Sequence, residues 1–118
     1  MTAEEFKRSR GLPLEIRALQ EARQGFTIPS HRRYCDQIIA QRVLRLVEVN
    51  SIINQIQDPV QRKIVNSYLS GDRKTFETIA EDENYCLRTI TRAFKAAIND
   101  LIARGILEDA ENTPQTAL

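Results

Sequence analysis

Residues 76–107 constrain the fold most, because they read as a short helix, a tight turn and a longer helix. Thr75 is placed to cap the first helix, and Phe76, Ile79 and Ala80 lie on its predicted buried side. Ala80 is small enough to let two helices cross closely. Asn84 falls in the turn, where a left-handed backbone is often required and asparagine tolerates it well. The stretch therefore predicts two helices that cross at a tight turn.

The second helix is predicted to begin near Cys86 or Leu87. Its apolar stripe consists of Ile90, Phe94, Ala97, Ile98 and Leu101. The rest of its surface carries Arg88, Thr89, Thr91, Arg92, Lys95 and Asn99. A helix crossing followed by a helix with a free basic face is the build of a DNA-binding helix-turn-helix. The alternative is a plain helical hairpin whose charged face is simply solvated.

The length of 118 residues suits one compact domain with a real core. Hydrophobic residues make up 42% of the chain and Gly and Pro only four each, so we expect most of it to be ordered. Few runs alternate with period two, and no Asn-Gly or Asp-Gly hairpin signal occurs. The sequence therefore predicts an all-α fold.

The N-terminal part predicts one short helix before a long one. Residues 1–11 are polar and mixed in charge, and we expect the start of this segment to be frayed. Pro13 suits the first turn of a helix that ends before Gly25. Phe26 and Ile28 then belong to an extended connector, and we expect both to anchor it on the core.

Ser30 is a predicted N-cap, and no helix breaker follows until Pro59, so this should be the longest helix. Its apolar positions are Ile38, Ile39, Val43, Leu44, Leu46, Val47, Val49, Ile52, Ile53 and Ile56. They cover more surface than the single stripe that one packed face needs. Either the rest of the chain wraps this helix on two sides, or part of it meets a second copy in a homodimer.

Asp58 and Pro59 form a boundary signal, with Asp as N-cap and Pro at the first helical position. The helix should run to about Leu69 and end at Ser70, Gly71 and Asp72. Its predicted inward residues are Val60, Ile64, Val65, Tyr68 and Leu69.

Gly105 is predicted to take the left-handed position that ends the last helix. Beyond it, residues 108–118 read as a flexible acidic tail. The chain thus divides into N-terminal helices (1–57), a helix-turn-helix region (58–107) and the tail (108–118), within one compact domain overall.

The net charge of +1 does not by itself argue for nucleic acid, so any basic surface must come from segregation of charge. His31, Arg32 and Arg33 form one basic cluster, whereas Arg88, Arg92 and Lys95 form another. Acidic residues gather at positions 81–83 and in the tail.

Several functions find little support in the sequence. His31 and Cys35 have helical metal-ligand spacing, but a zinc site needs three or four ligands, and the other cysteine, Cys86, lies on a distant helix. We therefore expect no metal and no cofactor. A lone His and the absence of a glycine-rich phosphate loop argue against an enzyme. Without a CxxC, a signal core or a long apolar run, we expect a reduced protein in the cytoplasm, with no membrane partner.

Residues 56–65, 68–71, 79–80 and 88–92 resemble region four of bacterial sigma factors and its phage relatives. The closer resemblance, over residues 38–101, is to small phage and prophage activators of late genes, of the RinA and ArpU type. Those proteins carry a long helix followed by a sigma-like helix-turn-helix. The chain departs from the pattern at Glu83, where leucine is usual, and at Cys86, where Ser or Thr usually caps the recognition helix.

The resemblance implies that Arg88, Thr91, Arg92 and Lys95 face the major groove of double-stranded DNA, with Thr89 beside them. It also implies that Arg73, Lys74 and Thr75, at the start of the preceding helix, lie over the DNA backbone. The alternative is that Arg73 and Lys74 are simply two exposed residues of a loop.

The leading hypothesis is a sequence-specific transcription regulator, a phage or prophage late-gene activator that binds promoter DNA and contacts RNA polymerase as a homodimer. It would act in the bacterial host cytoplasm and associate with the nucleoid when bound. A DNA-packaging or replication accessory protein of the small-terminase kind is an alternative. A sigma-like module that binds protein through the same helices is another.

Overall fold

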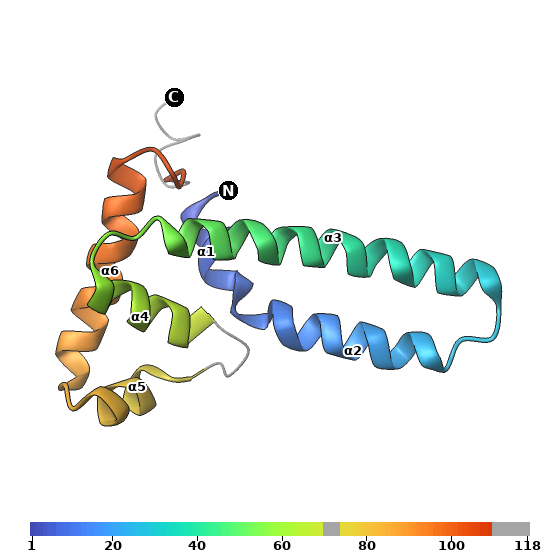
Figure 1. Cartoon of the computed structure of the whole chain (residues 1–118), viewed down its shortest axis with the longest axis horizontal. Coiled ribbons are helices and arrows are strands. Elements are labelled where there is room, and N and C mark those ends of the chain that lie inside the picture. The colour runs from blue at the N-terminus through green and yellow to red at the C-terminus, as the bar shows by residue number, and fades with distance from the viewer. Residues whose placement is uncertain (70–73, 110–118) are drawn as a thin grey trace, which may run out of the picture.

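A computed structural model of the chain describes residues 1–69 and 74–109 and is all-α, as predicted (Figure 1). Its helices are α1 (Ala3–Arg8), the 3-10 turn η1 (Ser9–Gly11), α2 (Leu12–Gln24), α3 (Pro29–Asn54), α4 (Pro59–Leu69), α5 (Phe76–Glu83) and α6 (Leu87–Ala103). Among the described residues the only β-type pairing is an isolated parallel bridge between Thr2 and Glu108.

The molecule consists of a helical body and a projecting hairpin. Helices α2 and α3 run antiparallel and extend away from the body formed by α1, α4, α5 and α6 (Figure 1). The radius of gyration is 17.0 Å, whereas a compact chain of this length would have about 13.5 Å. An ion pair joins Arg42 to Glu15 at 2.7 Å, and Arg23 pairs with Asp36, so two exposed ion pairs bridge the helices of the hairpin.

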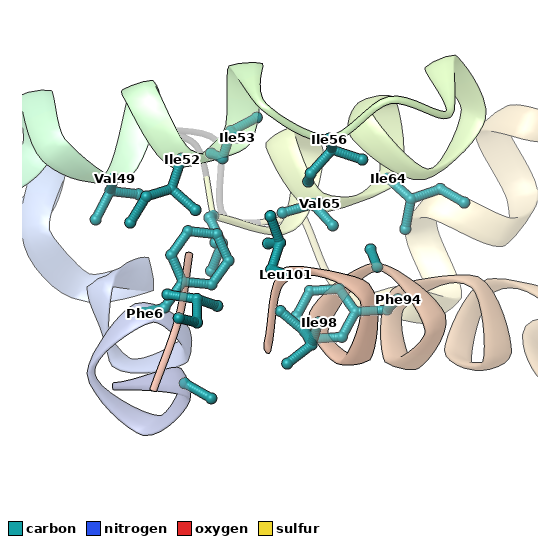
Figure 2. Packing of buried hydrophobic residues seen from close by; sticks show 14 of the residues in the cluster. Phe6, Val49, Ile52, Ile53, Ile56, Ile64, Val65, Phe94, Ile98 and Leu101 are labelled. Carbon is teal, nitrogen blue, oxygen red and sulfur yellow. The ribbon is translucent and has the colours of Figure 1, made fainter. Parts of the chain in front are cut away.

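One hydrophobic core holds the body together. The C-terminal end of α3 supplies Val49, Ile52 and Ile53, and Ile56 follows in the connector to α4; all four are at most 5% exposed. Figure 2 shows these side chains facing Phe6 of α1, Ile64 and Val65 of α4, and Phe94, Ile98 and Leu101 of α6. The core therefore draws on residues from both sides of the predicted boundary at residue 57.

The N-terminal residues are helical, and the prediction that they fray is wrong. Thr2 caps α1, because its Oγ1 accepts a hydrogen bond from the Glu5 N–H at 3.1 Å. Phe6 is fully buried. The Ala3 N–H donates to the Glu108 oxygen at 2.9 Å, and the Glu108 N–H donates to the Met1 oxygen at 3.1 Å. The chain that follows α6 thus fastens the N-terminus to the body, a long-range contact that local polarity does not reveal.

The connector before α3 also differs from its prediction. Helix α3 begins at Pro29, and Ser30 lies inside its first turn, because proline suits the first helical position. Phe26 and Ile28 are 37% and 50% exposed, so they do not anchor the connector on the core. The prediction that α3 is the longest helix is confirmed, at 26 residues.

Helix α4 confirms the boundary signal at its start. Asp58 Oδ1 accepts hydrogen bonds from the N–H groups of Val60 at 2.8 Å and Gln61 at 3.2 Å. Ile64, Val65 and Leu69 are buried as predicted, but Val60 is 46% exposed, so its predicted inward position is wrong. The predicted helix end at residues 70–72 lies outside the described residues, as does the tail from residue 110.

Gly105 ends α6 in the predicted left-handed conformation, with φ 76°. Its N–H donates to the Ile102 oxygen at 3.0 Å, and the Ile106 N–H donates to the Leu101 oxygen at 2.9 Å. This pair of bonds defines a Schellman motif. It turns the chain back toward α1.

Candidate nucleic-acid interface

Helix α5 and the turn after it have the predicted local structure. Thr75 Oγ1 accepts a hydrogen bond from the Thr78 N–H at 3.2 Å and so caps α5. Asn84 is left-handed, with φ 58° and ψ 35°. The Tyr85 N–H donates to the Ala80 oxygen at 3.0 Å, which closes the end of the helix. Three residues therefore separate α5 from α6.

Helix α6 has one buried face and one basic face. The five residues of its predicted apolar stripe are at most 7% exposed, so that prediction is confirmed. Arg88, Arg92 and Lys95 recur at i, i+4 and i+7, which places them on one face, opposite Ile90 and Ala97. We call the exposed set Arg88, Thr91, Arg92, Lys95 and Asn99 the basic stripe.

The cations of the basic stripe are not neutralised within the described part of the chain. No ion pair or hydrogen bond forms there from the side chains of Arg88, Arg92 or Lys95. Asp100, the acid of α6 nearest to them in sequence, bonds Arg104 at 3.2 Å. A row of unpaired cations on a rigid helix creates a local positive potential even though the net charge is +1.

The two threonines near the start of α6 are already hydrogen-bonded. The Thr91 hydroxyl donates to the Leu87 oxygen at 2.7 Å, so its oxygen remains an acceptor on the basic stripe. The Thr89 hydroxyl lies 3.0 Å from Cys86 Sγ. Thr89 lies about 100° around the helix from Arg88, on the side away from Thr91, and its hydroxyl is directed to the N-cap residue Cys86.

Cys86 occupies the N-cap position of α6 without a side-chain bond to the helix backbone. Its thiol is exposed. The Thr89 hydroxyl and, to a smaller extent, the nearby Thr89 backbone N–H lower the pKa of the Cys86 thiol below its ordinary value, because donors close to the sulfur favour the charged thiolate.

The predicted backbone-contact residues before α5 differ from one another. Thr75 is exposed at the cap. Lys74 is partly buried, and its Nζ pairs with Asp82 at 2.9 Å. Arg73 lies outside the described residues. Thr75 is therefore available at the α5 N-terminus, whereas Lys74 is held by a carboxylate of the same helix.

Aromatic packing fixes α5 and α6 against α4. The rings of Tyr68 and Phe76 stack with centroids 4.4 Å apart, and Phe94 meets Phe76 edge-on at 5.2 Å. Because each ring comes from a different helix, the basic stripe is presented by a rigid unit.

No group of three potential metal ligands forms among the described residues. The Cys35 thiol is buried and donates to the Leu19 oxygen at 3.3 Å, and the His31 ring meets Phe26 edge-on. Nor does any described helix combine the length and the apolar character that crossing a membrane requires.

Comparison of the chain with protein-family models, curated proteins and solved structures finds no match.

Proposed function

We propose that the protein is a sequence-specific DNA-binding transcription regulator that places α6 in the major groove. The observation that carries this proposal is the basic stripe: unpaired cations on the face of α6 opposite its buried side. A solvated helix face in a protein of near-neutral charge is commonly mixed in sign. Here the cations are separated from the acids of α5, two of which are paired with Lys74 and Lys63.

The side chains of the stripe suit different parts of DNA. Arg88 and Arg92 each offer a planar fork that matches O6 and N7 of guanine. The Thr91 methyl group suits the thymine methyl, whereas Lys95 suits a phosphate. At the N-terminus of α5, Thr75 and the helix dipole favour a phosphate as well.

The resemblance to phage late-gene activators supplies the biological setting of this proposal. In that setting the protein acts in the cytoplasm of a bacterial host, joins the nucleoid when bound, and recruits RNA polymerase through a surface other than the basic stripe. The helix, the three-residue turn and the second helix are compatible with the sigma-like motif of those activators.

Selection from a pool of random DNA duplexes at near-physiological salt tests the proposal. A dimeric regulator should enrich a motif in two parts, with half-sites about one helical turn (~34 Å) apart. Absence of any enriched motif, with only weak binding that salt abolishes, would contradict sequence-specific regulation.

The exposed face of α3 supports self-association as part of the proposal. Leu44 is 70% exposed and Val47 is 60% exposed, although both are large apolar side chains on a long helix. A homodimer through this face would pair two regulators. A ring of many subunits would instead favour the small-terminase-like alternative. Light scattering of the purified protein separates the two, and Leu44→Glu should shift either assembly toward monomer.

A protein-interaction module remains the third candidate, since Tyr85 in the α5–α6 turn and Leu87 at the start of α6 are exposed. Salt separates this candidate from DNA binding. Phosphate contacts release counterions, so affinity for DNA falls steeply with salt concentration, whereas affinity for a protein partner bound through apolar side chains does not.

A further inference from the structure

A hollow of about 480 Å³ lies beside the basic stripe, between α1 and α6. Its lining includes the aromatic residues Tyr68, Phe76 and Phe94, and also Lys7 of α1 and Thr91 and Lys95 of α6. Helix α1, which the sequence analysis does not predict, therefore brings Lys7 to the hollow that Lys95 of the basic stripe also lines.

The aromatic part of the hollow is already occupied by its own packing. Phe76 stacks on Tyr68 at 4.4 Å, and the Arg10 guanidinium lies 4.4 Å above the same Tyr68 ring. Two groups this close cannot share one face, so both faces of Tyr68 are covered. Phe94 is only 7% exposed. A base or another planar ligand thus finds no free face on Tyr68 or Phe94, and the charged groups that line the hollow are the two ammonium groups.

Neither ammonium group is strongly neutralised. Lys95 has no ion pair within the described residues, and Lys7 pairs with Glu4 at 3.4 Å on the surface, with side-chain exposures of 42% and 51%. Exposed pairs of this kind contribute little, typically about 0–1 kcal/mol. A phosphate can therefore compete with Glu4 for Lys7.

The charge changes sign just beyond Lys7. A neighbouring hollow along α6 is lined by Glu4 and Asp109 together with Ile102 and Lys7. An anion is thus favoured between Lys7 and Lys95 and disfavoured further toward the C-terminus of α6. The positive surface has a defined end.

The position of the hollow fits the edge of a DNA groove. From Arg88 to Asn99 the stripe is about 16 Å long at 1.5 Å per residue, whereas the major groove is about 12 Å wide. If the N-terminal part of α6 meets base edges, its later turns reach the backbone that borders the groove. Phe76, the first residue of α5, also lines this hollow, so the capped N-terminus of α5 lies on the same flank.

We propose that Lys7 and Lys95 together bind a DNA backbone phosphate across this hollow, which makes α1 part of the DNA interface. This inference rests on the proposed function. The occupant is a phosphodiester rather than a small aromatic ligand, because the charges at the rim are positive and the rings of Tyr68 and Phe94 are covered.

The test measures the affinity of Lys7→Ala for a selected duplex by fluorescence anisotropy over a salt series. Loss of one phosphate contact should lower affinity about 5–10-fold at 0.1 M salt and reduce the salt slope by about 1. The loss should be equal for the selected and a scrambled duplex, because phosphates carry no sequence information. Glu4→Gln, which frees Lys7, should raise affinity.

Two further variants separate the possible failures. Arg17→Ala removes one charge from α2 of the hairpin and should leave affinity unchanged. If Arg92→Ala weakens binding while Lys7→Ala matches the wild-type affinity and slope, the phosphate site is overturned and the proposed function stands. If neither variant weakens binding, both proposals fail. Lys7→Arg keeps the charge and should bind like the wild type, whereas a loss equal to that of Lys7→Ala would contradict an electrostatic role.

Discussion

Cys86 shows at the scale of one residue how the chain departs from the sigma-like pattern. It occupies a helix N-cap, where Ser, Thr, Asp and Asn are strongly preferred because their oxygen accepts backbone hydrogen bonds. Its sulfur instead lies 3.0 Å from the Thr89 hydroxyl. Helix α6 therefore starts without the side-chain cap that its position calls for.

Replacing this residue should stabilise the protein. Cys86→Ser supplies a hydroxyl that can accept the Thr89 N–H, and we expect a gain of about 0.5–1 kcal/mol, measured as a higher midpoint in thermal or urea unfolding. Cys35→Ser, which alters the buried thiol, is the matched control and should not stabilise. A Cys86→Ser midpoint equal to or below that of the wild type would show that the cap does not limit the stability of α6.

The same residue gives a pH dependence. Folding lowers the pKa of the Cys86 thiol, so the reactive thiolate forms at lower pH in the folded chain than in the unfolded chain. The rate of Cys86 alkylation increases with pH as the thiolate forms. In a Cys35→Ser background, the midpoint of this increase should therefore lie at lower pH for the folded protein than for the protein unfolded in urea. Thr89→Val removes the hydroxyl contact and should move the midpoint of the folded protein to higher pH. Coincident folded and unfolded profiles would disprove the stabilising contact.

At the scale of elements, the features that the sequence predicted correctly are those that depend on interactions between neighbouring residues. The Asp58 and Thr75 caps, the left-handed Asn84 and Gly105, and the buried stripe of α6 each depend on neighbours within a turn or two. The basic face of α6 follows from the same helical period, which is why the core of the candidate site could be predicted.

Long-range contacts determine the features that the sequence did not reveal. Helix α1 depends on backbone bonds to Glu108, far along the chain, although Thr2 and Glu5 have the spacing of a capping box, which would have indicated its start. Lys74 is held by Asp82 across the length of α5. Periodicity also cannot decide whether an apolar residue finds a partner, as the exposure of Ile28 illustrates.

The role of α1 in the core can be measured. Phe6 is fully buried among residues of α3 and α6, and Phe6→Ala should destabilise the protein by about 3–5 kcal/mol. Leu14→Ala, on α2 and 41% exposed, is the control and should have a small effect. Unfolding of Phe6→Ala at the wild-type urea midpoint would mean that α1 does not belong to the core in solution.

At the scale of the whole molecule, two exposed surfaces lie on different helices. The body presents the basic stripe, whereas the hairpin projects from it and carries exposed Leu44 and Val47 on α3 (Figure 1). Under the proposed function, one surface would bind DNA and the other a second copy of the chain. This separation would let self-association and DNA binding occur together, as a regulator with paired half-sites requires.

The central claim is that the basic stripe binds DNA, and the most direct measurement is the affinity of Arg92→Ala for a selected duplex at several salt concentrations. Arg92 is exposed and unpaired within the described residues, so the fold should survive with an unchanged circular dichroism spectrum and melting temperature. We predict a loss of about 1–3 kcal/mol in binding that is larger for the selected sequence than for a scrambled one. Unchanged affinity of the folded variant at every salt concentration would remove α6 from the interface and contradict the proposed function.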